Sequence, residues 1–130
     1  MTRSLLAAAV AVTAVGCSTL PPEARQQLRR SLQLYQTGQY DRAIEELDKF
    51  LALYGASRPA AEGFYLRAQS YLKLGRIQPA RADLKRALKL SNRDDLTARV
   101  HAALGSIAYR QHNPTLACWH YQQALPGLPD

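Results

Sequence analysis

The sequence is poor in the residues from which catalytic and metal sites are built. It has two cysteines and three histidines in 130 residues, and it contains neither a phosphate-binding loop nor a nucleophile elbow. Cys118 and His120 are two positions apart, so on a helix their side chains point about 200° apart and cannot hold one metal ion. We therefore expect no enzymatic activity, no cofactor and no metal site.

Strand-like patterning and long apolar runs are also absent. Apolar and polar residues do not alternate over any stretch long enough to indicate a strand. The main apolar run, residues 4–16, is shorter than the roughly 20 residues that a membrane-spanning helix needs. It follows Arg3 and matches the apolar region of an export signal. Residues 1–16 are therefore interpreted as a signal peptide, and no other stretch is apolar enough to cross a membrane.

The end of this run resembles a bacterial lipoprotein box. The family pattern is approximately Leu-Ala-Gly-Cys, and residues 14–17 are Ala-Val-Gly-Cys. The resemblance implies cleavage before Cys17, lipidation of Cys17 and a tether over residues 17–22. Because Ser18 rather than Asp follows, it also implies sorting to the outer membrane, with the protein on the periplasmic face of the cell envelope. An ordinary signal peptide followed by a chance cysteine is the alternative.

Lipidation of Cys17 would leave Cys118 as the only free thiol. Lone cysteines on helices are most often small core residues, and we expect this for Cys118. An intermolecular disulfide is the alternative.

A set of five positions recurs twice, each time 37 residues further along the chain. The copies are Gly38, Tyr40, Ala43, Leu47 and Leu51; then Gly75, Ile77, Ala80, Leu84 and Leu88; then His112, Pro114, Ala117, Tyr121 and Leu125. A fixed period of about 20–50 residues indicates a stacked repeat protein. Apolar residues at steps of three and four predict six helices in three pairs. Their expected ranges are 22–37 and 40–54, 59–74 and 77–90, and 94–111 and 114–125, with a capping box from Ser91 to Asp94.

The helix pairs resemble tetratricopeptide repeats, whose unit is two antiparallel helices in about 34 residues. In the third copy His101, Leu104, Gly105 and Ala108 stand where the family has Trp-x-x-Leu-Gly-x-x-Tyr. The resemblance implies an all-α fold, an α-solenoid of three helix pairs over residues 24–130, with repeats at 24–60, 61–97 and 98–130. It also implies a protein-binding role without catalysis.

In this family the first helix of each repeat lines a concave groove that holds a segment of a partner. By position, the groove residues would be Arg25, Leu28, Leu32 and Tyr35, then Tyr65, Gln69, Leu72 and Lys73, then Arg99, Ser106, Tyr109 and Arg110. Lys73 and Arg110 would pair with an acidic peptide or a terminal carboxylate. An ordinary helix surface is the alternative. One subfamily's carboxylate clamp is not expected, because Leu28, Leu32 and Leu66 occupy three of its positions.

A second interface is expected at the C-terminal end of the stack. Repeat arrays usually finish with a polar capping helix, whereas Leu125 is followed by only five residues. Leu116, Trp119 and Leu125 are therefore predicted to leave apolar surface open for self-association or docking. In the alternative interpretation, Trp119 folds back onto its own repeat and residues 126–129 cover the rest.

The chain is basic, with a formal net charge of +7. In the helix at 77–90, Arg81, Lys85 and Lys89 are four residues apart, partly offset by Asp83. This stripe is either a solvated outer face or a site for anionic lipid or an acidic protein. Nucleic acid would be in the wrong compartment for an exported chain. The leading hypothesis is a lipid-anchored adaptor that binds envelope proteins. The alternatives are a basic repeat module that binds nucleic acid or anionic lipid, and a homo-oligomeric structural protein.

Overall fold

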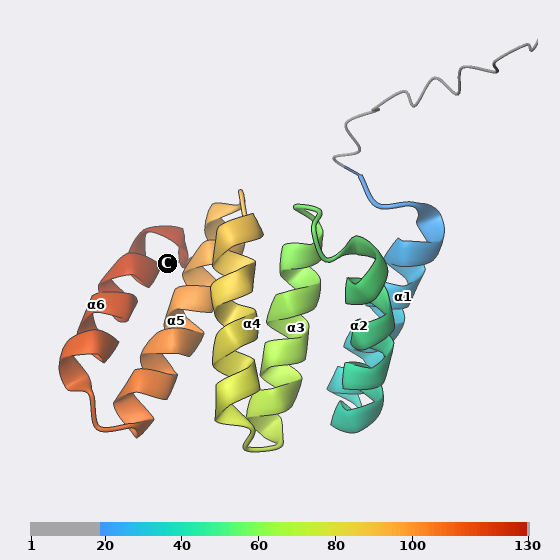
Figure 1. The fold of residues 1–130 in the computed structure, drawn as a ribbon. Coiled ribbons are helices and arrows are strands. Elements are labelled where there is room, and N and C mark those ends of the chain that lie inside the picture. Colours follow the sequence, from blue (N-terminus) through green and yellow to red (C-terminus); the bar gives the residue numbers. More distant parts are fainter. Residues whose placement is uncertain (1–18, 130) are drawn as a thin grey trace, which may run out of the picture.

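The computed structural model describes residues 19–129, which fold into six α-helices and a short 3₁₀ helix (Figure 1). The predicted signal peptide and Cys17 lie outside the described residues. The helices are α1 (Pro22–Gln36), α2 (Tyr40–Tyr54), α3 (Ala60–Lys73), α4 (Ile77–Leu90), α5 (Asp94–Arg110), α6 (Pro114–Ala124) and η1 (Leu125–Gly127). None of the described helices is long and apolar enough to span a bilayer.

The helices pair in chain order and the pairs stack side by side. Helix α1 packs on α2, α3 on α4, and α5 on α6, while α2 contacts α3 and α4 contacts α5 across the pair boundaries. Figure 1 shows the resulting row, from α1 at one end to α6 at the other. The predicted all-α solenoid of three helix pairs is therefore confirmed.

Each pair is closed by the same turn, which a residue with positive φ makes possible. Gly38 has φ 78° and Gly75 has φ 73°, and His112 takes the third copy of this position with φ 57°. The residue after each one donates its N–H to a carbonyl five positions back: Gln39 to Leu34, Arg76 to Tyr71, and Asn113 to Ala108. Such turns satisfy carbonyl groups that the helix end leaves without partners. The turn recurs every 37 residues, at positions 38, 75 and 112, and so forms part of the repeat seen in the sequence.

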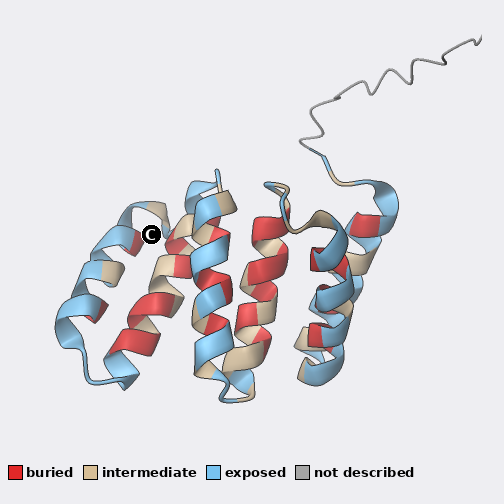
Figure 2. Ribbon diagram, viewed as in Figure 1, coloured by how far each residue is buried: buried red, intermediate tan, exposed pale blue. Residues whose placement is uncertain are grey.

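Small residues at repeating positions let the two helices of a pair approach closely. Ser31 and Ala68 are fully buried, and a Cβ on Gly105 would lie only 2.8 Å from the Tyr121 ring. The opposite helices contribute Ala43, Ala80 and Ala117, which are also buried. Figure 2 shows that the buried residues follow the inner faces of the helices along the whole stack.

Three local expectations were wrong. Cys118 is exposed rather than a core residue. Its first-repeat counterpart Ile44 is buried, but no later helix in the described part of the chain covers that side of α6. The Ser91 hydroxyl contacts Arg93 and Thr97 instead of closing a capping box, because α5 begins three residues later with Arg93 as its N-cap. Asp83 is 6% exposed and points into the stack, so it does not offset the outer basic stripe.

Candidate functional site

The first helix of each pair lines one continuous face of the stack, which is hollowed at α1 and α3. This first hollow has a volume of about 370 Å³. Its wall is largely apolar and is made by Leu28, Leu32, Tyr35, Tyr65 and Leu66, with Arg25, Arg29, Glu62, Gln69 and Arg99 around them. A large apolar side chain of another molecule would be buried there against leucine and tyrosine side chains.

A second hollow continues the first between α3 and α5. It has a volume of about 320 Å³ and shares Tyr65, Gln69 and Arg99 with its neighbour. Its further lining residues are Leu72, Lys73, Ala102, Ala103, Ser106, Ile107, Arg110 and Leu128. We call the two hollows together the concave groove. The part of the groove at α1 is thus lined mainly by apolar side chains with Arg25 and Arg29 beside them, and the part at α5 carries Lys73 and Arg110.

Arg99 stands at the junction of the two hollows and is held by neighbours. Its guanidinium lies 5.1 Å from the centre of the Tyr65 ring and 3.6 Å from a carboxylate oxygen of Glu62. Asp95, one turn earlier on α5, also contacts it at 3.4 Å. Burial raises the pKa of the Tyr65 hydroxyl, and the charge of Arg99 opposes that rise. Arg99 therefore shapes the groove, and most of its charge is already paired.

Lys73 and Arg110 differ from Arg99 because both are exposed and neither forms an ion pair with any residue that the structure describes. They lie at the ends of α3 and α5 on the rim of the second hollow. A carboxylate from a partner could pair with either one without displacing an existing contact.

The structure brings together all the predicted groove residues except Tyr109. That tyrosine is 70% exposed and lies beside His112 and Pro114, outside the concave groove. Arg29 and Leu66 also line the groove, in addition to the residues predicted for it. Both lie one turn from predicted residues, so helical spacing could have found them. Helical spacing does not predict Leu128 in the groove, because Leu128 reaches the groove only where the chain folds back after α6.

The predicted second interface is divided between two surfaces. Leu116 and Trp119 face α4 across a hollow on the other side of the stack, whereas Leu125 lies at the end of α6. The C-terminal segment packs on α5, where Gly127 lies against Asp94 and Ala98. It leaves Tyr121 42% exposed and Leu125 68% exposed, whereas their first-repeat counterparts Leu47 and Leu51 are 0% and 8% exposed.

His101 and His120 join the two helices of the last pair. Their Nδ1 atoms are 3.1 Å apart, so one ring must donate and the other accept. Burial lowers the pKa of both side chains below 6.5, and for His120 the neighbouring His101 lowers it further. Among the described residues, no group of three or more His, Cys, Asp and Glu side chains is placed to hold a metal ion.

The histidine pair predicts a loss of stability in mild acid. The unfolded chain takes up protons near pH 6.5, while the folded chain binds them only at lower pH. Stability is therefore fully present above about pH 6.5 and falls as the pH drops from there through the folded pKa values. The urea midpoint should be lower at about pH 5.5 than at about pH 7.5.

Replacement of both histidines by glutamine should remove most of this difference in urea midpoint. His112→Asn, which changes only the exposed turn histidine, should leave it in place. An equal pH dependence in the double variant would contradict the assignment to His101 and His120.

Comparison with known proteins agrees with this architecture. A family model described as tetratricopeptide repeat matches residues 28–95 and again residues 65–130. Among solved structures, the second tetratricopeptide-repeat domain of Spaghetti (RPAP3), bound to the HSP90 peptide SRMEEVD, is similar with a TM-score of 0.70. The two chains are 24% identical, and the alignment covers 82% of this chain and 94% of that one. The comparison with curated proteins gave no match. Because the family matches cover most of the chain, this protein belongs to the tetratricopeptide-repeat family.

Proposed function

We propose that this protein is a non-catalytic adaptor of the bacterial cell envelope that holds a segment of a partner protein in its concave groove. The observation that carries the proposal is the two-part chemistry of the groove. Leucine and tyrosine line the part at α1 with Arg25 and Arg29 beside them, and Lys73 and Arg110, which have no carboxylate partners in the described structure, rim the part at α5. Such a surface suits a segment with a large apolar residue and a carboxylate further along.

The mode of binding has support from the solved relative. The Spaghetti domain shares the fold and holds a peptide that contains acidic residues. In the present chain Lys73 and Arg110 lie together on the rim of the second hollow, where they would pair with an acidic side chain or a terminal carboxylate. Arg99 is expected to contribute less, because Glu62 and Asp95 already hold its guanidinium.

The anchor in this proposal is a lipid on Cys17, which would hold the adaptor on the periplasmic face of the outer membrane. Acyl chains contribute about 0.8 kcal/mol per buried CH₂, so several chains would retain a folded domain at a bilayer. Pro22, where α1 begins, comes five positions after Cys17, and a chain segment of that length reaches no further than about 18 Å. The partner would therefore be an envelope protein near the membrane.

One capture experiment tests both parts of the proposal. Tagged full-length protein is isolated from membranes of its host, and the proteins bound to it are identified by mass spectrometry. Cys17→Ser should move the protein from the membrane fraction to the soluble fraction. The double variant Lys73→Glu/Arg110→Glu should stay in the membrane and lose its partner by roughly tenfold or more, because paired charges become repulsive.

The control is Arg86→Glu/Lys89→Glu, which makes the same charge change on exposed positions of α4 outside the groove. This variant should keep both the membrane location and the partner. Membrane retention of the Cys17→Ser protein would overturn the lipid anchor. Equal partner recovery with the groove variant would overturn the role of the groove.

A further inference from the structure

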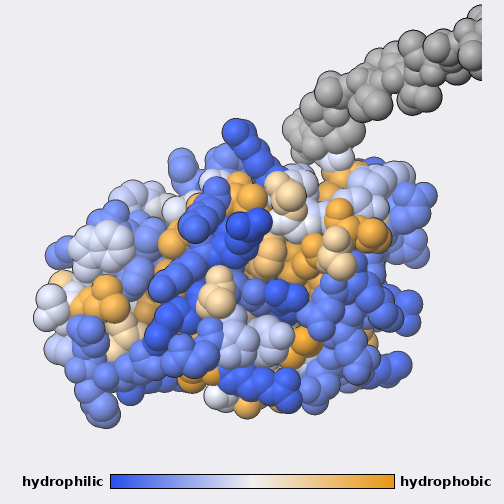
Figure 3. Space-filling model, in the orientation of Figure 1, coloured by the Kyte–Doolittle hydropathy of each residue, from blue (hydrophilic) through white to orange (hydrophobic). Residues whose placement is uncertain are grey.

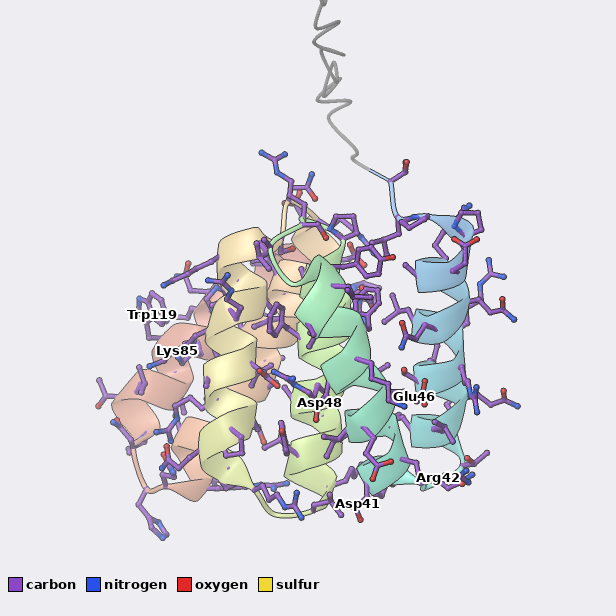
Figure 4. All side chains as sticks on the ribbon, turned by 45° about the vertical axis from the view of Figure 1, so that its right-hand side comes forward. Asp41, Arg42, Glu46, Asp48, Lys85 and Trp119 are labelled. Atoms are coloured by element: carbon purple, nitrogen blue, oxygen red, sulfur yellow. The ribbon has the colours of Figure 1, made fainter. Side chains whose placement is uncertain are left out.

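Another hollow, distinct from the two that form the concave groove, lies on the opposite side of α5, between α4 and α6. It has a volume of about 470 Å³. One wall is formed by Arg81, Lys85 and Leu88 of α4. The floor is formed by α5 with its C-cap Gln111, through His101, Leu104, Ile107 and Ala108. The other wall is formed by α6 with its N-cap Asn113, through Leu116, Trp119 and His120. Figure 4 shows Lys85 and Trp119 close together at this gap. We call it the convex hollow.

The equivalent gap one repeat earlier is filled by the chain itself. There Arg67 of α3 donates to both carboxylate oxygens of Asp83 on α4 at 2.8 Å and to Asp48 on α2 at 2.8 Å. These three residues correspond, 37 positions later, to Leu104, His120 and Lys85. The bridging guanidinium is thus replaced by a leucine that is too short to cross the gap, and both acidic walls are lost.

The convex hollow consequently has a positive wall facing an apolar one. Arg81 contacts the amide of Gln111, and no carboxylate among the described residues pairs with Arg81 or Lys85. Asp83, the acidic residue nearest to them in sequence, is turned away toward Arg67. Opposite them, Leu116 and Trp119 keep about half of their surface exposed. In Figure 3 the surface over α4 is largely hydrophilic, and a hydrophobic patch lies beside it over α6.

We propose that the convex hollow is a second binding site, for an acidic segment of a partner protein that inserts a large apolar side chain. Carboxylates of that segment would pair with Arg81 and Lys85, and the apolar side chain would lie between Trp119 and the buried floor. The hollow's volume of about 470 Å³ leaves room for a side chain, and Leu104, Ile107 and Ala108, which are almost fully buried, form its apolar base. A bilayer surface would contact the rim and leave the floor untouched. The site is separate from the concave groove and does not depend on the function proposed for it.

The chain carries its own probe for this site, since Trp119 is its only tryptophan. A random peptide library displayed on phage is selected on the full chain, after removal of phage that bind the variant Arg81→Glu/Lys85→Glu. The selected sequences should combine a large apolar residue with neighbouring Asp or Glu. Synthetic copies without tryptophan should change the emission of Trp119, and the variant should bind them at least about tenfold more weakly.

Two matched controls separate this site from a general charge effect and from the groove. Arg86→Glu/Lys89→Glu changes the same charge on the same helix outside the hollow, and Lys73→Glu/Arg110→Glu changes it in the concave groove. Both should bind the selected peptides like the unmodified protein. The inference is overturned if no discriminating peptide is recovered, if the peptides lack acidic residues, or if the variants bind equally. A change in Trp119 emission with phosphatidylglycerol vesicles but not with peptides would assign the hollow to a membrane surface instead, and would also overturn it.

Discussion

Replacement of Phe50 by alanine should lower the free energy of unfolding by about 3–5 kcal/mol, the usual cost of emptying a buried aromatic site. Phe50 is the largest of the fully buried side chains. It leaves α2 toward α3, where a Cβ on Gly63 would lie 2.7 Å from its ring, so it joins the first pair to the second. Because a domain of this size has only about 5–15 kcal/mol of stability in total, thermal and urea unfolding will report the loss directly.

Leu53→Ala is the matched control for Phe50→Ala. Leu53 lies three residues later on the same helix and is 76% exposed, so its removal should change stability by no more than about 0.5 kcal/mol. Similar losses for the two variants would show that burial between α2 and α3 is not what stabilises the stack.

Replacement of Arg67 by leucine should be almost as damaging, with a loss of about 3 kcal/mol or more. The change leaves Asp83 buried without the two hydrogen bonds, each 2.8 Å long, that Arg67 donates to it. A buried carboxylate without a partner is costly, because the protein interior solvates charge poorly. The measurement is equilibrium unfolding in urea at neutral pH.

The double variant Arg67→Leu/Asp83→Leu separates an unpaired charge from lost packing. It removes both partners, so it should lose clearly less stability than Arg67→Leu alone. Arg76→Leu is the control for an exposed pair. Arg76 lies 3.7 Å from Asp41 with both side chains largely exposed, so the change should cost less than about 1 kcal/mol. A double variant as unstable as the single one would disprove the unpaired-charge explanation.

The helices could be predicted closely because the signals that define them are local. Apolar residues at steps of three and four mark each helix, and Gly38 and Gly75 mark the turns within two pairs. Pro114 marks the first residue of α6, as predicted. The start of α5 at Asp94 was also as predicted, but its cap was not. Ser91 was expected to close a capping box with Asp94, whereas Arg93 is the N-cap.

The candidate site was less predictable, because it depends on which helix faces lie side by side. The face of α1, α3 and α5 that lines the concave groove follows from the repeat period, so most of its residues could be named in advance. Helical periodicity could not place Tyr109 outside the groove or bring Leu128 into it. The contact between Arg99 and Glu62 was also unpredictable, because it forms only when α3 and α5 pack together. The pairing of Arg99 with Asp95 is local to α5.

By itself, the sequence determined the repeat period, the six helices and the positions of the small residues, because helix formation and turn geometry depend on neighbours within a few residues. Tertiary structure alone decided that Arg67 joins α2, α3 and α4 while Leu104 leaves the next gap open. It also placed Lys85 opposite Trp119 and left Cys118 exposed. These outcomes depend on contacts between residues far apart in the chain. The local pattern of a helix does not specify which of its side chains other helices will cover.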